Sequence, residues 1–245
     1  MNRLFRRRQS MPERATLDID GKAVSVVVRQ VRQARHYRLA VDVRKGPVLT
    51  VPGGGRWAEA EAFLAQHRDW LKARLKRTSP PISFIGGIQI PLRGVPHWIV
   101  SIATLRGRVM SGEDGGAPVL LVPGGATHLP RRLTDWLKAE ARADLEAAVG
   151  RHARTLGVEP GPVRVRDQST RWGSCSEAGR LNFNWRLILA PPFVLDYVAA
   201  HEVAHLLEMN HSPDFWAVLR RALPELDHGR AWLKAHGKTL HAYGG

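Results

Sequence analysis

The sequence predicts an α+β fold, and three observations lead to this prediction. Segments in which apolar and polar residues alternate, as in half-buried strands, recur along the chain. Two long stretches rich in Ala, Leu, Glu and Lys follow such segments and have the apolar spacing of helices. The 245 residues, 44% of them hydrophobic, suffice for one large or two small globular domains. No run of 18 apolar residues occurs, so no membrane insertion is expected.

The region of residues 16–149 is expected to contain strands and helices in a repeated order. The expected elements are strands at 17–31 (a hairpin turning at Asp20-Gly21), 37–43 and 47–52 before a helix at 56–77, then strands at 90–102 and 117–123 before a helix at 129–149. Val-Pro-Gly-Gly ends a strand in both series, and Trp-Leu-Lys-Ala lies inside the helix that follows. These matched marks predict two similar units, which an internal duplication would explain.

Basic residues outnumber acidic ones, and the excess lies mainly in the N-terminal half. The chain has 37 Lys and Arg against 22 Asp and Glu, a formal net charge of +15, of which residues 1–149 carry +12. Residues 1–15 begin with four arginines in eight positions and are expected to form a flexible basic tail. Such a charge attracts polyanions, so non-specific nucleic-acid contact through this half is one expectation. A basic composition without a specific partner is the alternative.

The chain has one cysteine, Cys175. One cysteine excludes an internal disulfide and a cysteine-based zinc finger, and it fits a reducing compartment. Because no apolar segment follows the basic N-terminus, no secretory signal is expected, and the predicted location is cytoplasmic. Because the chain has a single cysteine, any metal ion must be bound by histidines and carboxylates.

Residues 150–245 are expected to form a separate domain with a hairpin and a helix that carries the site. The expected elements are strands at 163–168 and 181–190 with a hairpin tip at 176–179, a helix from Pro191-Pro192 to about Leu207, and a further helix from Ser212-Pro213.

The first of these helices contains His201-Glu202-Val203-Ala204-His205, the H-E-x-x-H pattern. Residues four apart lie on the same face of a helix, so both imidazoles can bind one metal ion. Glu202, next to the first histidine, can approach a metal-bound water and take its proton as a general base. The pattern therefore predicts a site for one Zn²⁺ ion, with Glu202 as the catalytic residue.

His211 is the candidate third ligand. On an unbroken helix its side chain would point about 80° away from that of His201. Asn210, however, tolerates a left-handed helix cap, so the helix can end and the chain can turn before His211. Three histidines and an open position are typical of a catalytic zinc site. The alternative third ligand is a nearby carboxylate, Glu208 or Asp214.

The connection before the site helix reads Arg171-Trp172-Gly173-Ser174-Cys175-Ser176. A strand edge beside a metal can pair with an extended substrate, so this hairpin is expected to shape the cleft. Arg171 and Trp172 are the substrate-binding candidates, with Arg171 binding a carboxylate or phosphate group. The alternative is that Trp172, Trp185 and Arg186 are packing and ion-pair residues.

Residues 163–216 closely resemble the YgjP-like metallopeptidase domain, and are more distantly similar to SprT-type and Wss-type zinc proteases. The residues that carry the resemblance are Arg171-Trp172-Gly173-Ser174-Cys175-Ser176, Asn182-x-Asn184-Trp185-Arg186-Leu187, Pro191, Asp196-Tyr197-Val198, the H-E-x-x-H pattern and Asn210-His211-Ser212-x-x-Phe215-Trp216. The resemblance implies a small zincin-like catalytic domain, a hairpin plus the H-E-x-x-H helix, preceded by the strand-and-helix units. It also implies zinc on His201, His205 and His211, and Glu202 as general base.

The leading functional prediction is a zinc-dependent metallopeptidase that acts on a peptide or protein substrate. One alternative is a zinc-dependent hydrolase of nucleotide phosphoanhydrides, in which the basic half binds the phosphates, although the sequence has no glycine-rich P-loop. A second alternative is a nucleic-acid-associated protease that acts on proteins bound to DNA or RNA.

Overall fold

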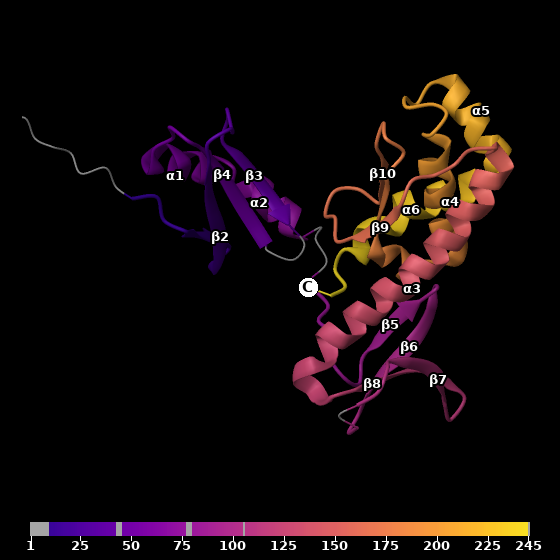
Figure 1. The fold of residues 1–245 in the computed structure, drawn as a ribbon. Coiled ribbons are helices and arrows are strands. Elements are labelled where there is room, and N and C mark those ends of the chain that lie inside the picture. Colours follow the sequence, from indigo (N-terminus) through magenta and orange to yellow (C-terminus); the bar gives the residue numbers. More distant parts are fainter. Residues whose placement is uncertain (1–9, 43–45, 77–79, 105, 245) are drawn as a thin grey trace, which may run out of the picture. The chain divides into compact units, whose positions relative to one another are not determined.

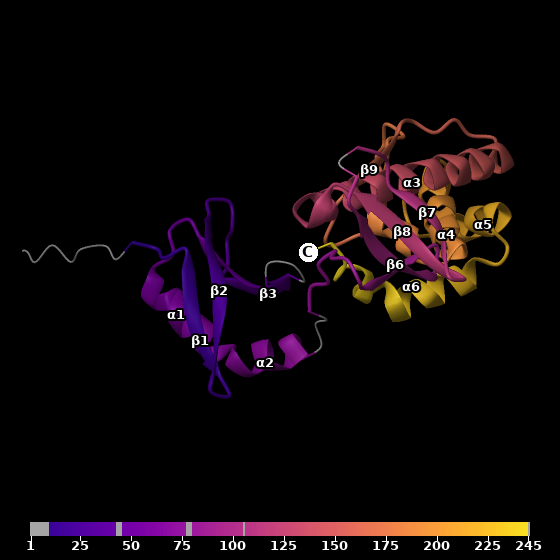
Figure 2. The same ribbon diagram turned by 90° about the horizontal axis from the view of Figure 1, so that it is seen from below.

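The computed structural model describes residues 10–42, 46–76, 80–104 and 106–244. The chain divides into two compact units, residues 1–81 and 82–245, and each has its own hydrophobic core. The described residues form six α-helices, one 3-10 helix and three sheets, the mixed α+β composition that the sequence predicts (Figures 1 and 2). Among these residues, no helix has the length and apolar character that a membrane span requires.

Unit 1 (residues 1–81) is a four-stranded sheet in the order β1-β2-β4-β3, packed against two helices. Its elements are β1 (Arg14–Ile19), β2 (Lys22–Val31), β3 (Arg38–Asp42), β4 (Gly46–Pro52), α1 (Trp57–Gln66) and α2 (Arg68–Lys76). Asp20 and Gly21 form the predicted hairpin turn with positive φ angles of 54° and 76°. Residues 1–9 of the predicted basic tail lie outside the described residues, and β1 begins at Arg14.

The helix predicted at 56–77 is divided into α1 and α2 at His67, so the prediction of one continuous helix was wrong. His67 has φ −97° and ψ 16°, outside the helical range. Its Nδ1 lies 2.8 Å from the carbonyl oxygen of Phe63, and the two rings stack with centroids 4.1 Å apart. The His67 N–H also donates to the Phe63 carbonyl, at 3.2 Å, so α1 ends where the His67 backbone leaves the helical range and not where a main-chain bond is lost.

The N-terminal part of unit 2 (residues 82–245) repeats the arrangement of unit 1. Its elements are β5 (Gln89–Leu92), β6 (Val95–Ile102), β7 (Met110–Asp114), β8 (Ala117–Pro123) and α3 (Gly125–Leu156). The order β5-β6-β8-β7 and the antiparallel, parallel and antiparallel pairings equal those of the sheet in unit 1. Strand β7 was not predicted, because all five of its residues are exposed and no apolar alternation marks it.

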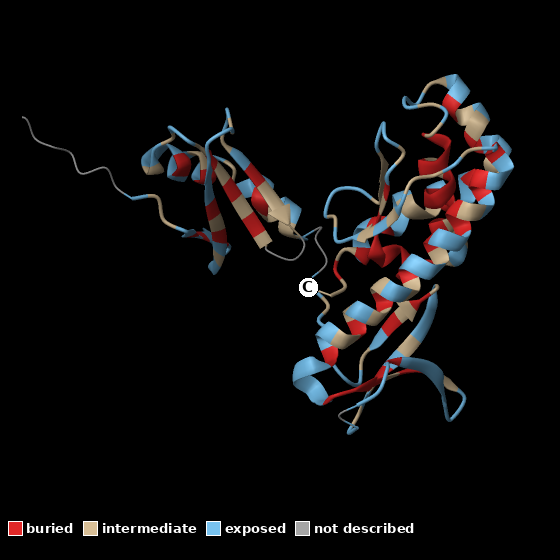
Figure 3. Cartoon of the chain, in the orientation of Figure 1, coloured by how far each residue is buried: buried red, intermediate tan, exposed pale blue. Residues whose placement is uncertain are grey.

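The long helix α3 joins this sheet to the rest of unit 2. Leu133 and Leu137 in its first half are fully buried, as are Leu145 and Ala148 in its second half. The helix contacts β6 and β8, and it also contacts the elements that follow it in the chain. Figure 3 shows buried residues along the length of α3. The domain boundary predicted at residue 150 lies inside this helix, whereas the compact unit begins at residue 82.

The C-terminal part of unit 2 contains a small sheet, one 3-10 helix and three α-helices. Its elements are β9 (Val163–Arg166), β10 (Gly173–Cys175), β11 (Leu181–Asn184), η1 (Trp185–Leu189), α4 (Pro192–Ala204), α5 (Pro213–Ala222) and α6 (Leu226–Leu240). The sheet order is β10-β11-β9, and the predicted hairpin tip closes with a hydrogen bond from the Gly179 N–H to the Ser176 carbonyl at 2.8 Å.

The strand predicted at 181–190 ends at Asn184, so its second half was predicted wrongly. The Asn184 side chain accepts a hydrogen bond from the Arg186 N–H at 3.0 Å and thereby caps the 3-10 helix η1. All five residues of η1 are buried. The apolar run that suggested a strand therefore reflects burial on every side.

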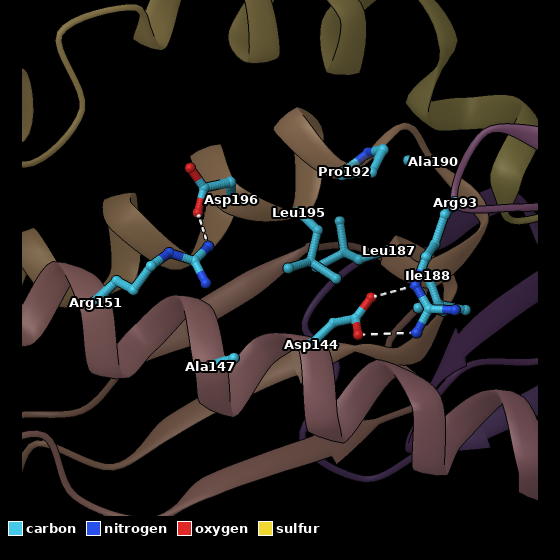
Figure 4. Close-up of a pocket in the computed structure, with 10 residues that line it drawn as sticks. All are labelled: Arg93, Asp144, Ala147, Arg151, Leu187, Ile188, Ala190, Pro192, Leu195 and Asp196. Atoms are coloured by element: carbon cyan, nitrogen blue, oxygen red, sulfur yellow. Dashed lines mark hydrogen bonds and ion pairs between the residues drawn. The ribbon is translucent and has the colours of Figure 1, made fainter.

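Two ion pairs tie α3 to neighbouring elements and flank a pocket of about 160 Å³ (Figure 4). Arg93, in the β5–β6 turn, donates two hydrogen bonds to Asp144 of α3, at 2.8 and 2.9 Å. Arg151 of α3 donates one to Asp196 of α4 at 2.8 Å. Apolar side chains of η1 and α4 lie between the two pairs. This pocket contains none of the predicted site residues. The Arg93–Asp144 pair holds the β5–β6 turn against α3, and the Arg151–Asp196 pair holds α4 against α3.

Candidate metal and catalytic site

The three histidines predicted as metal ligands come together in unit 2. His201 lies in the last turn of α4, His205 caps the end of that helix, and His211 lies in the connection to α5. Their candidate ligand nitrogens all lie within 4.8 Å of one another. Among the described residues, the cluster at this site consists of histidines alone, so neither predicted alternative carboxylate joins it.

The chain turn that brings His211 back differs from the expected one. Helix α4 ends at Ala204, earlier than predicted, and Asn210 does not have a positive φ. Instead, the Asn210 side chain accepts a hydrogen bond from the Ser212 N–H at 2.8 Å, which forms a local turn. The Ser212 hydroxyl then accepts one from the Phe215 N–H at 3.3 Å and caps α5, as predicted.

The arrangement of the imidazole nitrogens fits a divalent transition-metal ion. The Nε2 atoms of His201 and His211 are 3.1 Å apart. Two ligands of a tetrahedral Zn²⁺ ion lie about 3.3 Å apart, given Zn–N bonds of about 2.0–2.1 Å. The Nδ1 of His205 lies 2.9 Å from the Glu208 carbonyl oxygen, and a proton on Nδ1 leaves Nε2 free for a metal.

Burial keeps the imidazoles of His201 and His205 in the form that binds metals. Burial lowers the pKa of His201 to about 3, and the charges of His205, His211 and Arg230 act in the same direction. Burial is also the largest cause that lowers the pKa of His205. Neutral imidazole is the ligand form, so both side chains are ready to bind a metal ion at neutral pH.

Phe215 of α5 packs against all three imidazole rings. Its side chain is fully buried, and its ring centroid lies 4.5 Å from that of His205, 4.9 Å from that of His201 and 4.8 Å from that of His211. Contact with the Phe215 ring restricts the rotamers of all three candidate ligands. The H-E-x-x-H pattern gives no signal for this residue, which lies ten positions beyond the second histidine of the pattern.

Glu202 is buried against the neighbouring strand β10. Only 5% of its surface is exposed, and a Cβ atom on Gly173 would overlap its carboxylate. Burial raises the pKa of Glu202 to about 8, while the charge of Arg171 and a hydrogen bond from the Cys175 backbone oppose this rise. Gly173 therefore makes room for the carboxylate, a role that sequence reasoning did not assign to it.

The predicted substrate-binding residues Arg171 and Trp172 precede strand β10 and have different surroundings. Arg171 is exposed, and its charge acts on Glu202. Trp172 is half-buried and stacks on His241, which caps α6, with ring centroids 4.4 Å apart. Their binding of substrate stays a prediction. Arg186, by contrast, is fully buried, pairs with Asp167 and donates a hydrogen bond to the Tyr243 carbonyl, which is a packing role.

Comparisons with known proteins give a family match and a similar solved structure. A family model described as "YgjP-like, metallopeptidase domain" matches residues 35–236. The crystal structure of the metallopeptidase zymogen of Pyrococcus abyssi abylysin is similar with a TM-score of 0.34 and 21% sequence identity, over 37% of this chain and 93% of that one. No curated protein sequence matches the chain significantly.

Proposed function

The chain belongs to the YgjP-like metallopeptidase domain family, and from this premise we propose that it is a zinc-dependent peptidase. His201, His205 and His211 bind one Zn²⁺ ion, and Glu202 is the general base. The observation that carries this proposal is the convergence of three imidazoles whose candidate ligand nitrogens lie within 4.8 Å of one another. Three nitrogen ligands and an open position are the donor set of catalytic zinc sites.

When bound, the zinc ion polarises the scissile carbonyl and lowers the pKa values of water and of a nearby carboxyl group. Glu202 takes one proton from the water that attacks the carbonyl carbon, and the C–N bond breaks as this proton passes to the leaving amine. The burial of Glu202 beside Gly173 limits its rotamers, which supports a fixed position of its carboxylate during both proton transfers.

Strand β10 supports the binding of an extended peptide. It is the edge strand of the β10-β11-β9 sheet, and its residues Gly173–Cys175 lie beside Glu202. The main-chain N–H and C=O groups on the free edge of such a strand can pair with a substrate backbone. Arg171 and Trp172 precede β10 directly and are proposed to contact the side chains of the substrate.

Two substitutions test the proposal on the zinc-loaded full chain, with a heat-denatured protein mixture as substrate and mass spectrometry of new peptide termini as the readout. Glu202→Gln is expected to keep zinc and to lower turnover at least a thousandfold, because the general base is lost. His205→Ala is expected to lose zinc, as measured by metal analysis. Full activity of Glu202→Gln would refute the mechanism. If neither the wild type nor the variant made new termini, phosphate release from nucleotides would be tested next.

A second candidate, a protease that acts on proteins bound to nucleic acid, rests on the charge of unit 1. Residues 1–81 hold 18 Lys and Arg against 7 Asp and Glu, so +11 of the net charge of +15 lies in a third of the chain. Arg29, Arg32, Arg35 and Arg38 are all exposed. We expect DNA affinity to fall steeply with salt, and to fall less steeply after Arg→Gln changes at these four positions. No binding at low salt would end this candidate. The cytoplasmic location likewise stays a prediction.

A further inference from the structure

Helix α6 brings an arginine to the histidine cluster that the sequence motif does not include. The guanidinium carbon of Arg230 lies 4.6 Å from the ring centroid of Trp216 on α5. The Trp216 ring in turn lies 6.5 Å from the ring of His201 and 6.3 Å from that of His211. Arg230 therefore stacks on an aromatic side chain that borders two of the three candidate ligands.

The backbone that carries Arg230 is fixed by a close approach of α6 to α4. A Cβ atom on Gly229 would lie 2.5 Å from the Cβ of Tyr197 and 3.0 Å from the Phe193 carbonyl oxygen, so no larger residue fits there. His228 stacks on Phe193 with centroids 4.1 Å apart. Because the two residues that precede Arg230 in the chain pack against α4, the start of its side chain is fixed relative to the site.

The guanidinium of Arg230 has no carboxylate partner within 4 Å among the described residues. Asp227, one turn earlier on α6, pairs with Arg220 at 3.5 Å instead. The residue is exposed, so its donors can reach a ligand. A guanidinium whose face lies over an aromatic ring still has N–H donors at its edge. Two of these N–H groups can donate to the two oxygens of one carboxylate, which matches the guanidinium in a bidentate pair.

The charges of Arg230 and of the predicted substrate-binding residue Arg171 affect different residues of the site. The charge of Arg230 acts on His201 and Tyr197, where burial is the larger cause of the pKa shifts, whereas that of Arg171 acts on Glu202. The two arginines therefore do not duplicate one another. Arg230 belongs to the α4–α5–α6 side of the site, and Arg171 belongs to the β10 side.

We infer that Arg230 binds a carboxylate of the substrate and so selects peptides that place a negative charge next to the histidine cluster. The carboxylate is either the free C-terminus of a peptide or an Asp or Glu side chain, since both offer the same acceptor. This inference rests on the proposed peptidase function. It makes Arg230 a specificity-determining residue and leaves the proton transfers to Glu202.

The test measures binding without turnover, in the zinc-loaded Glu202→Gln background of the full chain. Three N-acetylated alanine hexapeptides serve as probes: one with a free C-terminal carboxylate, one amidated, and one amidated with a central Asp. Isothermal titration at about 150 mM salt gives their dissociation constants. We expect at least one of the two peptides with a carboxylate to bind about tenfold more tightly than the neutral one. The peptide that gains shows which carboxylate Arg230 recognises.

Three substitutions in the same background separate a specific contact from the general positive charge of the chain. Arg230→Gln is expected to abolish the preference, and Arg230→Lys to retain part of it. Arg221→Gln, an equal loss of charge at an exposed position of α5, is expected to keep it. An absent preference in the parent, an unchanged preference in Arg230→Gln, or an equal loss in Arg221→Gln would each overturn the inference. Failure of the peptidase proposal is seen separately, as absent cleavage by the wild type.

Discussion

Two regions of the molecule share one sheet topology and differ in the helix that follows it. In unit 1, the sheet is followed by α1 and α2, helices of 10 and 9 residues that cover the sheet and end. In unit 2, the sheet is followed by α3, a helix of 32 residues that continues to the catalytic elements. The two regions thus share their strand arrangement. The length of the helix that follows the sheet decides whether further elements can pack on that helix.

The difference lies in what the second half of α3 contacts. Its buried residues from Leu145 to Leu156 join the core that also includes α4 and η1. Among the described residues of unit 1, the core contains residues from its own sheet and its two helices. The comparison teaches that the site depends on α3 as a platform, while unit 1 has a core of its own.

A matched pair of leucine substitutions, one in each unit, tests this comparison, and it has the largest expected effect on stability. Leu145→Ala, in α3, and Leu64→Ala, in α1, both remove a buried leucine side chain. Each is expected to lower the free energy of unfolding of its own unit by about 3 kcal/mol, through lost burial and a residual cavity. Leu145→Ala should also lower zinc retention on heating, and Leu64→Ala should not. Calorimetry and metal analysis check both expectations, and one shared transition that moves equally in both variants would contradict them.

A matched pair of glycine substitutions compares the β5-β6-β8-β7 sheet with the β10-β11-β9 sheet of unit 2. Gly173→Ala in β10 places a methyl group where the Glu202 carboxylate lies, so turnover is expected to fall about a hundredfold with zinc retained. Gly112→Ala in β7 meets nothing within 4 Å and is expected to leave turnover unchanged. Peptidase rates and zinc content decide between these outcomes. Equal rates for the two variants would show that Glu202 tolerates displacement.

The clustering of the candidate metal ligands could be predicted from the sequence better than their surroundings. His201, Glu202 and His205 are readable because helical spacing is a local property, and His211 required only a turn after them. Phe215, Gly173 and Arg230 reach the site through tertiary contacts, which no local period reports. Strand β7 and the 3-10 helix η1 escaped prediction because neither has an apolar period: one is exposed throughout and the other is buried throughout.

The ion pair between α3 and α4 has no counterpart among the described residues of unit 1, and it is expected to make unit 2 sensitive to acid. Burial acts to raise the pKa of Asp196, but hydrogen bonds and charge from His152 and Arg151 outweigh it and hold the pKa below its usual value. A carboxyl group with a depressed folded-state pKa adds stability above its unfolded-state pKa of about 3.9. This contribution is lost as the pH falls through the lower, folded-state value.

Asp196→Asn is therefore expected to lower the stability of unit 2 by about 1–2 kcal/mol at pH 7 and by progressively less below pH 4. The amide keeps the shape of the side chain but lacks the charge that His152 and Arg151 contact, at 2.9 and 2.8 Å. Urea unfolding of the wild type and the variant between pH 3 and pH 7 measures the effect. A difference that stayed constant over this range would mean that shape, rather than charge, joins α4 to α3. A difference that vanished in acid would identify the ion pair as the element that fixes the site helix on its platform.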